Sequence, residues 1–415
     1  MKKELVIWEK FSFYLCCFLS MLIPIPLFLD GLVGGVILQK ESFPVVNSFP
    51  IPIGLLAFLI VFIIFFINSF LFKQEYSLLV KNRTNRLVLY FLSIFIFLWS
   101  FFLSGNNFFR VFQLILPFIL ILIVGFPVGK GKIKKITYFY LISFFCFNST
   151  HLVSIFLNNN LFEVSEREYG LYWGYGIYQA FVSYPGVLAL FFCLVSFLFF
   201  FEKRVILKFF LFIFILVIIV AIGLAARRIS FLEMIFTFLF LFLFLFIDFV
   251  KNKGVVNKNL FLSCVSFIFL IFFILSFYFN MPIFRRASSG MDDGGVDSGR
   301  LIIYERAFNF LFSDVYFLMF GYNGYSGFHN YFLELIFAIG LFPFLITILT
   351  FVFMFKVRIN LSFSDIGSYI LLSLFGCFFL QSMFNASITQ PLYLCNFLMI
   401  MLISFFYINS EVRSV

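Results

Sequence analysis

Polar residues able to support chemistry gather in one stretch of an otherwise apolar chain, from Arg285 to about Gly340. This stretch contains His329, one of only two histidines, next to Asn330, with Glu334 one helical turn further on. It also contains four arginines: Arg285, Arg286, Arg300 and Arg306. A guanidinium group offers a planar fork of donors that suits phosphate, and an imidazole can take up a proton near neutral pH. The combination favours an anion-binding site beside a general base; the alternative for His329 is a capping or packing role at a helix start.

A helix is expected to begin near Arg300, after a glycine-rich segment. The Asp and Ser at 297–298 could cap its first turn. In such a helix Arg300, Tyr304 and Ala307 would share one face, because they follow i, i+4, i+7 spacing. Arg306 would point elsewhere, so the two arginines could hold different groups or different sides of one group.

A second arginine pair, Arg227 and Arg228, lies in a turn of a few residues between two apolar runs. An arginine near the hydrocarbon boundary is costly unless it is paired or reaches the polar headgroups. The pair could therefore extend toward the headgroups, or it could bind the diphosphate of a lipid carrier. Both interpretations remain open from the sequence.

The composition excludes a soluble protein and several kinds of site. The 415 residues are 63% hydrophobic and 12% charged, whereas soluble domains average about 25% charged residues. The seven cysteines lie in apolar segments without CxxC spacing, so neither a disulfide framework nor a zinc site is supported. The acidic run at 292–297 lacks the alternating oxygen ligands of a calcium loop, so no metal is expected. The net charge of +10 comes from scattered short basic loops, a pattern typical of membrane topology and not of nucleic-acid binding.

The apolar runs predict an all-α polytopic membrane protein that forms one domain over 1–415. A spanning helix needs roughly 20 apolar residues. By that rule we expect twelve spans, near 11–33, 51–72, 87–104, 111–129, 136–156, 184–201, 209–226, 230–249, 260–283, 330–355, 367–387 and 391–408. Two long loops are expected on the outer side, 157–183 and the partly helical 284–329, which separates spans nine and ten. The aromatic residues of 157–183 could stack on sugars or form an interfacial belt.

The distribution of basic residues predicts that both termini lie inside. With that topology the inner segments carry 20 of the 29 Lys and Arg residues. Of the nine outer basic residues, eight are Arg, against the general trend. An outer face enriched in arginine indicates an anionic ligand there. The alternative is ion pairing with the outer acidic residues.

A series of residues in this region resembles the signature of the O-antigen polymerase and O-antigen ligase superfamily. The series is Arg300, Gly321, Gly324, His329, Asn330 and, after nine residues, Gly340. The arginine in the turn before span eight, the twelve-span layout and the major outer loop also look like that superfamily's pattern. The matched motifs cover roughly 220–345. The ligase pattern continues to a small residue three positions after Gly340, where this chain has Pro343.

The resemblance implies a glycosyltransferase of the bacterial inner (cytoplasmic) membrane, with cytoplasmic termini and a periplasmic active site. It would need no metal and no cofactor. A polymerase transfers the growing glycan from undecaprenyl diphosphate to the terminal sugar of another lipid-linked repeat unit, whereas a ligase transfers the finished glycan to lipid A-core. Because Pro343 departs from the ligase pattern, we favour the polymerase. Its partners would be the lipid-linked oligosaccharide, the lipid bilayer and a chain-length regulator, but no nucleic acid.

The resemblance also implies roles for the polar residues. His329 would be the base that acts on the acceptor. Arg300, together with Arg227, Arg228 and Arg306, would hold the diphosphate leaving group, and the sequence leaves open which of the four contact it. The substrate-binding residues would be Arg227, Arg228, Arg306, Arg285, Arg286, Asn330, Glu334 and Tyr304. A flippase or other transporter is the competing class, but transporters usually show related halves and charges near the membrane midplane. The sequence shows no clear repeat, and its polar residues lie at one membrane edge.

Overall fold

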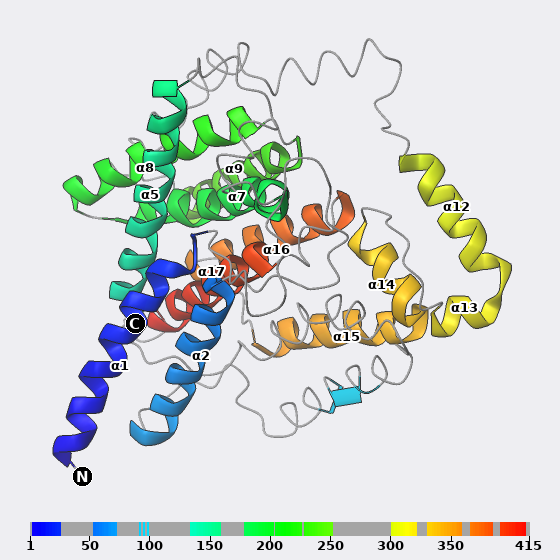
Figure 1. Cartoon of the computed structure of the whole chain (residues 1–415), viewed down its shortest axis with the longest axis horizontal. Helices are drawn as coiled ribbons and strands as arrows, with labels where there is room; N and C mark the ends of the chain where they lie inside the picture. Colours follow the sequence, from blue (N-terminus) through cyan, green and yellow to red (C-terminus); the bar gives the residue numbers. More distant parts are fainter. Residues whose placement is uncertain are drawn as a thin grey trace.

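The structure, a computed structural model, is helical throughout the residues it describes, and no strand occurs among them (Figure 1). The described residues are 2–25, 53–72, 133–158, 178–202, 204–225, 228–251, 300–321, 330–358, 366–384 and 391–411, with a few helical residues between 91 and 98. The prediction of an all-α protein is confirmed for these residues.

Most of the long helices overlap the predicted apolar runs. They are α1 (Lys2–Leu22), α2 (Ile53–Phe72), α5 (Ile133–Asn158), α7 (Tyr178–Phe201), α8 (Val205–Ala225), α9 (Arg228–Lys251), α12 (Arg300–Ser313), α13 (Val315–Phe320), α14 (Tyr331–Ile339), α15 (Leu341–Arg358), α16 (Ile366–Phe384) and α17 (Pro391–Glu411). Since no water is present in a bilayer to satisfy the backbone, long apolar stretches form helices there.

Three segments among the described residues are long and apolar enough to cross a membrane: Glu4–Leu22, Val205–Gly223 and Ile229–Ile247. Shorter apolar helical segments lie in α2, α7, α16 and α17. The protein is therefore a helical membrane protein. The total of twelve spans stays a prediction, because the spans expected at 111–129 and 260–283 lie outside the described residues.

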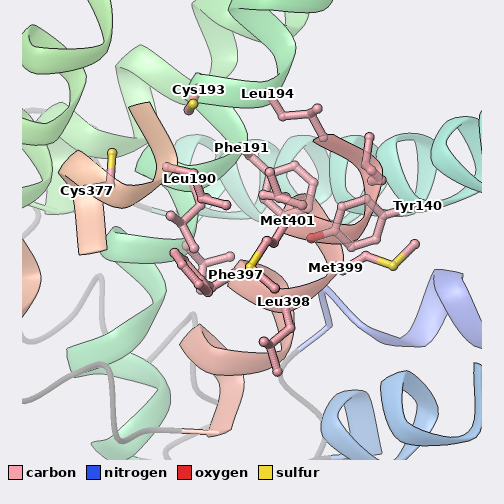
Figure 2. Close-up of a cluster of buried hydrophobic side chains, with 14 of the residues drawn as sticks. Tyr140, Leu190, Phe191, Cys193, Leu194, Cys377, Phe397, Leu398, Met399 and Met401 are labelled. Atoms are coloured by element: carbon pink, nitrogen blue, oxygen red, sulfur yellow. The ribbon is translucent and has the colours of Figure 1, made fainter. Parts of the chain in front are cut away.

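The centre of the bundle is formed by α7 and α17, which are buried on all sides over much of their length. No residue from Val187 to Val195 exposes any of its surface, and those from Leu392 to Ile403 expose at most 1%. A helix that is apolar all round belongs in an interior. Figure 2 shows Phe397 and Met401 of α17 among Leu190 and Phe191 of α7 and Tyr140 of α5. The Tyr140 hydroxyl donates a 2.7 Å hydrogen bond to Asn396 Oδ1, which joins α5 to α17.

The peripheral helices expose large apolar side chains in the way that lipid-facing helices do. Along α8, the exposed set is Val205, Ile206, Phe209 and Phe210, and along α9 it includes Leu239, Phe242 and Phe246. Soluble monomers rarely expose such contiguous apolar faces. These faces therefore agree with a membrane environment.

Two predicted spans differ from the structure. The span expected at 11–33 is wrong in its bounds, since α1 begins at Lys2 and ends at Leu22. Pro24 and Pro26 follow within four residues, and proline lacks the N–H that would continue the helix. The span expected at 330–355 is two helices, α14 and α15, which meet at Gly340.

The junction at Gly340 has a local cause. Gly340 adopts a φ of +87°, which an L side chain rarely tolerates, and its N–H donates a 2.8 Å bond to Ile336 O. Its carbonyl accepts from Phe344 N at 3.2 Å, which starts α15. Pro343 is tolerated because it occupies the first turn of α15, where a backbone N–H has no helical partner. Hydropathy is continuous across the junction and gave no sign of it.

Candidate functional site

Helix α12 packs on α14 through the face predicted from its spacing. Tyr304 and Ala307 pack with Leu333 and Phe337 of α14 in one small apolar cluster. The neighbouring ring of Phe310 stacks on Phe337, with 5.4 Å between centroids. Tyr304 therefore has a packing role, and its buried hydroxyl has no hydrogen-bond partner among the described residues.

Of the two arginines of α12, Arg306 points away from α14 as predicted, whereas the face taken by the Arg300 side chain stays a prediction. The helix begins at Arg300, as expected, and for that residue the description is limited to the backbone. Arg306 is exposed, whereas its neighbour Ala307 is 2% exposed, so Arg306 points away from α14. Helices α12 and α13 form the outlying arm beside α14 and α15 in Figure 1.

The arm is held against the α14–α15 junction by a contact between two glycines. Gly321, directly after α13, has a φ of +89°. A Cβ atom at Gly321 would lie 2.8 Å from Ala338 O and 2.8 Å from Gly340 N. The backbone at Gly321 is therefore in direct contact with the backbone at the end of α14, and no side chain larger than that of glycine fits at position 321. This Gly321–Gly340 contact gives a packing reason for two of the glycines in the motif.

Asn330 and Glu334 form the buried start of α14. Asn330 caps the helix: its Oδ1 accepts from Leu333 N at 3.1 Å, and its carbonyl accepts from Glu334 N at 2.9 Å. Both side chains are nearly inaccessible, at 6% and 5% exposure. The prediction that they lie one turn apart is confirmed. Since the cap occupies Oδ1, the amide NH₂ of Asn330 is the group that could meet a ligand.

The remaining predicted site residues can be placed only in part. Arg228 begins α9, and the structure describes its backbone alone. The other four lie outside the described residues: Arg227, Arg285, Arg286 and His329. Their roles stay predictions.

Sequence reasoning missed a buried carboxyl group, that of Glu233 in α9. The side chain is 0% exposed, and its Oε2 accepts a 3.0 Å hydrogen bond from Gln381 Nε2 in α16. Among the described residues, Oε1 of each side chain has no hydrogen-bond partner. The available signal was a single ionisable residue in the apolar run 229–247, which in a membrane segment is a functional candidate by default.

Helix α16 connects this buried pair to the start of α14. Gln381 lies three residues before the end of α16, and it contacts α9 through Glu233. On another face of α16, the ring of Phe379 lies 5.8 Å from that of Phe332 in α14. The start of α9, the end of α16 and the start of α14 therefore meet at one end of the bundle, which we call the site end.

Just before α8 begins, at the end of that helix away from the site end, polar and charged side chains form a network near the surface. Arg204 Nε donates to Glu202 Oε1 at 3.1 Å, and Arg204 Nη2 donates to the Tyr138 hydroxyl at 2.9 Å. Partial burial by itself would raise the pKa of Glu202, but the hydrogen bonds and charge of Arg204 outweigh it and lower that pKa. Glu202 and Arg204 lie in a predicted inner loop, and Tyr138 lies near the start of the span predicted at 136–156.

Comparison with known protein families, curated proteins and solved structures finds no match for this chain.

Proposed function

We propose that the protein is a glycosyltransferase that polymerises undecaprenyl-diphosphate-linked O-antigen repeat units on the periplasmic face of the bacterial inner membrane. One observation carries the proposal. Helix α12, which begins at Arg300, packs on α14, whose cap Asn330 directly follows His329 in the chain. The helix expected to bind diphosphate and the helix that follows the expected base are therefore neighbours.

The proposed reaction needs few groups. A sugar hydroxyl of the acceptor repeat unit attacks the anomeric carbon of the donor glycan, and a new glycosidic C–O bond forms. The C–O bond to the lipid diphosphate breaks, and undecaprenyl diphosphate leaves with the electron pair. Fixed guanidinium groups stabilise the charge that develops on the diphosphate.

His329 accepts the proton of the attacking hydroxyl in this mechanism, a contribution of about 10²- to 10⁴-fold in typical enzymes. Glu334, buried one turn into α14, supplies a carboxylate on the helix that follows the histidine. A carboxylate near an imidazole raises its basicity. Arg300 acts on the leaving group, and the exposed Arg306 is available to the second phosphate or a sugar.

The helices next to the proposed site have close backbone contacts and a buried cap, which suits a site that must hold its groups in place. The buried Asn330 cap satisfies the first turn of α14, and the Gly321–Gly340 contact holds the end of α13 against the α14–α15 junction. A reaction that depends on positioning benefits from groups held in fixed geometry.

The decisive experiment uses purified protein in lipid nanodiscs with undecaprenyl-diphosphate repeat units as the single substrate and a chelator present. We expect a ladder of longer glycans. If product forms only after lipid A-core is added, the protein is a ligase. If lipid-linked substrate crosses a bilayer and no new glycosidic bond forms, the protein is a transporter; either result overturns the proposal.

A further inference from the structure

The Glu233–Gln381 pair has no place in the mechanism above, yet it is a buried polar contact inside the membrane-spanning part of the bundle. A carboxyl group within a spanning helix is costly to bury. Glu233 is nevertheless fully buried, five residues after the start of α9. At 1.5 Å per residue it lies about 8 Å below Arg228 along the helix axis.

Four helices enclose the pair closely. Gly186 of α7 lies against it, because a Cβ atom there would be 2.8 Å from Gln381 Nε2 and 2.9 Å from the ring of Tyr393 in α17. One turn further along α9, Thr237 Oγ1 lies 3.8 Å from Cys377 Sγ of α16, which continues the polar contact between the same two helices. The Glu233–Gln381 hydrogen bond therefore joins α9 to α16 in the buried part of the bundle.

The position of the pair links it to the site end. Any shift of α9 against α16 moves the start of α9 at Arg228 relative to α14, since α16 also packs on α14 through Phe379 and Phe332. The ring of Phe236 in α9 is also seated on Gly376 of α16, where a Cβ atom would overlap it. The Glu233–Gln381 bond adds a directed polar contact between the same helices, and its geometry would be lost if they slid past one another.

We propose that Glu233, acting through its hydrogen bond with Gln381, is a positioning residue that fixes the start of α9 relative to α14. The inference rests on the proposed function, because it assigns the arginine-bearing start of α9 to the diphosphate site. Glu233 touches no substrate in this scheme; its carboxyl oxygen serves as an acceptor for Gln381.

Three variants and a matched control separate positioning from other roles. Glu233→Ala and Gln381→Leu remove the hydrogen bond. Glu233→Gln keeps an acceptor oxygen for Gln381 and removes the ionisable group. The control is Tyr140→Phe, which removes an equally buried hydrogen bond, that to Asn396, between α5 and α17 and away from α9.

Two readouts are needed, both in nanodiscs. The first is hydrogen–deuterium exchange of backbone amides in residues 230–236. We expect about tenfold faster exchange there in Glu233→Ala and Gln381→Leu, the size expected when a buried hydrogen bond is lost, and wild-type exchange in Glu233→Gln and Tyr140→Phe. The second is the Kd for undecaprenyl diphosphate, expected to rise about tenfold in the same two variants and to stay unchanged in the other two.

The outcomes distinguish this inference from the proposed function. Unchanged exchange in 230–236 for Glu233→Ala and Gln381→Leu overturns the inference. So does a Glu233→Gln protein that fails as Glu233→Ala does, since the ionisable carboxyl itself would then be required. If the Kd rises as much in Tyr140→Phe, the loss of binding reflects general destabilisation of the bundle and the positioning role of the pair is overturned. If the wild-type protein binds no undecaprenyl diphosphate, the proposed function fails, whereas the exchange data still report whether the pair fixes α9.

Discussion

At the site end of the bundle Glu233 accepts a 3.0 Å hydrogen bond from Gln381, and at the far end of α8 Glu202 accepts a 3.1 Å bond from Arg204. The geometry is similar and the surroundings are not. Glu233 exposes 0% of its surface, whereas the Glu202 side chain is 13% exposed and its partner Arg204 is 60% exposed. Water and salt screen the second contact and can replace it, but nothing replaces the first. Burial, more than formal charge, decides which of the two contacts matters.

The other contacts at the site end and at the start of α8 show the same difference in burial. The site end contains a buried helix cap at Asn330 and a backbone-to-backbone contact at Gly321 and Gly340. The other end contains long side chains that meet at the surface, those of Tyr138, Glu202 and Arg204. Changes at the site end should therefore have large effects, and changes at the other end small ones.

The largest expected difference between the ends is catalytic. His329→Ala should lower turnover by about 10²- to 10⁴-fold, because the attacking hydroxyl loses its base. Binding of undecaprenyl diphosphate should stay near the wild-type value. Single-turnover assays with lipid-linked repeat units, paired with binding measurements, check this.

Arg204→Ala is the control for that experiment, because it changes a charged residue at the opposite end and should leave turnover unchanged. A normal ladder of glycans from the His329→Ala protein would remove the base assignment and leave the polymerase proposal intact. Equal losses in both variants would contradict the contrast between the ends.

Next in size is the Gly321–Gly340 contact. Gly321→Ala should cost about 2 kcal/mol in the free energy of unfolding, because a Cβ atom meets both an unfavourable backbone conformation and the backbone of α14. Gly321→Asn tolerates the left-handed φ better but also adds a Cβ atom. If crowding is the main cause, denaturant unfolding in detergent should show both variants destabilised; a fully stable Asn variant would show that conformation alone matters.

A smaller effect is expected at the cap of α14. Asn330→Ala should cost about 1 kcal/mol in the free energy of unfolding, since Leu333 N loses its partner. Asn330→Ser keeps an uncharged acceptor oxygen for the cap and should be close to wild type in stability. If Asn330 also contacts substrate through its amide, the Ser variant should be stable but less active. Thermal unfolding and turnover measured on the same samples separate the two roles.

The smallest effect is expected at Glu202 and depends on pH. The folded protein lowers the pKa of Glu202 below its unfolded value, mainly through Arg204 acting against partial burial. Its stabilising contribution is therefore present above the ordinary glutamate pKa of about 4.3, and it is lost as the pH falls through the lowered folded value. The difference in melting temperature between wild type and Arg204→Ala should be slight at pH 7 and vanish at lower pH. A difference that grows on acidification would have the wrong sign.

Much of the site end was visible in the sequence because it depends on local spacing. The start of α12 at Arg300 and the common face of Tyr304 and Ala307 follow from turn signals and helical periodicity. The pairing of Asn330 with Glu334 across one turn has the same origin. The break at Gly340 was not predicted, because an isolated glycine in an apolar run is compatible with a continuous helix.

The sequence by itself determined that this chain is a bundle of apolar helices, because in a bilayer each helix satisfies its backbone with hydrogen bonds to residues four positions away. Only the tertiary structure decided which polar groups meet. Gln381 lies 148 residues from Glu233, and Gly321 reaches Gly340 only because α13 folds back on α14. Such contacts depend on how whole helices pack, and the apolar side chains that drive the packing are too alike along the chain to specify one partner.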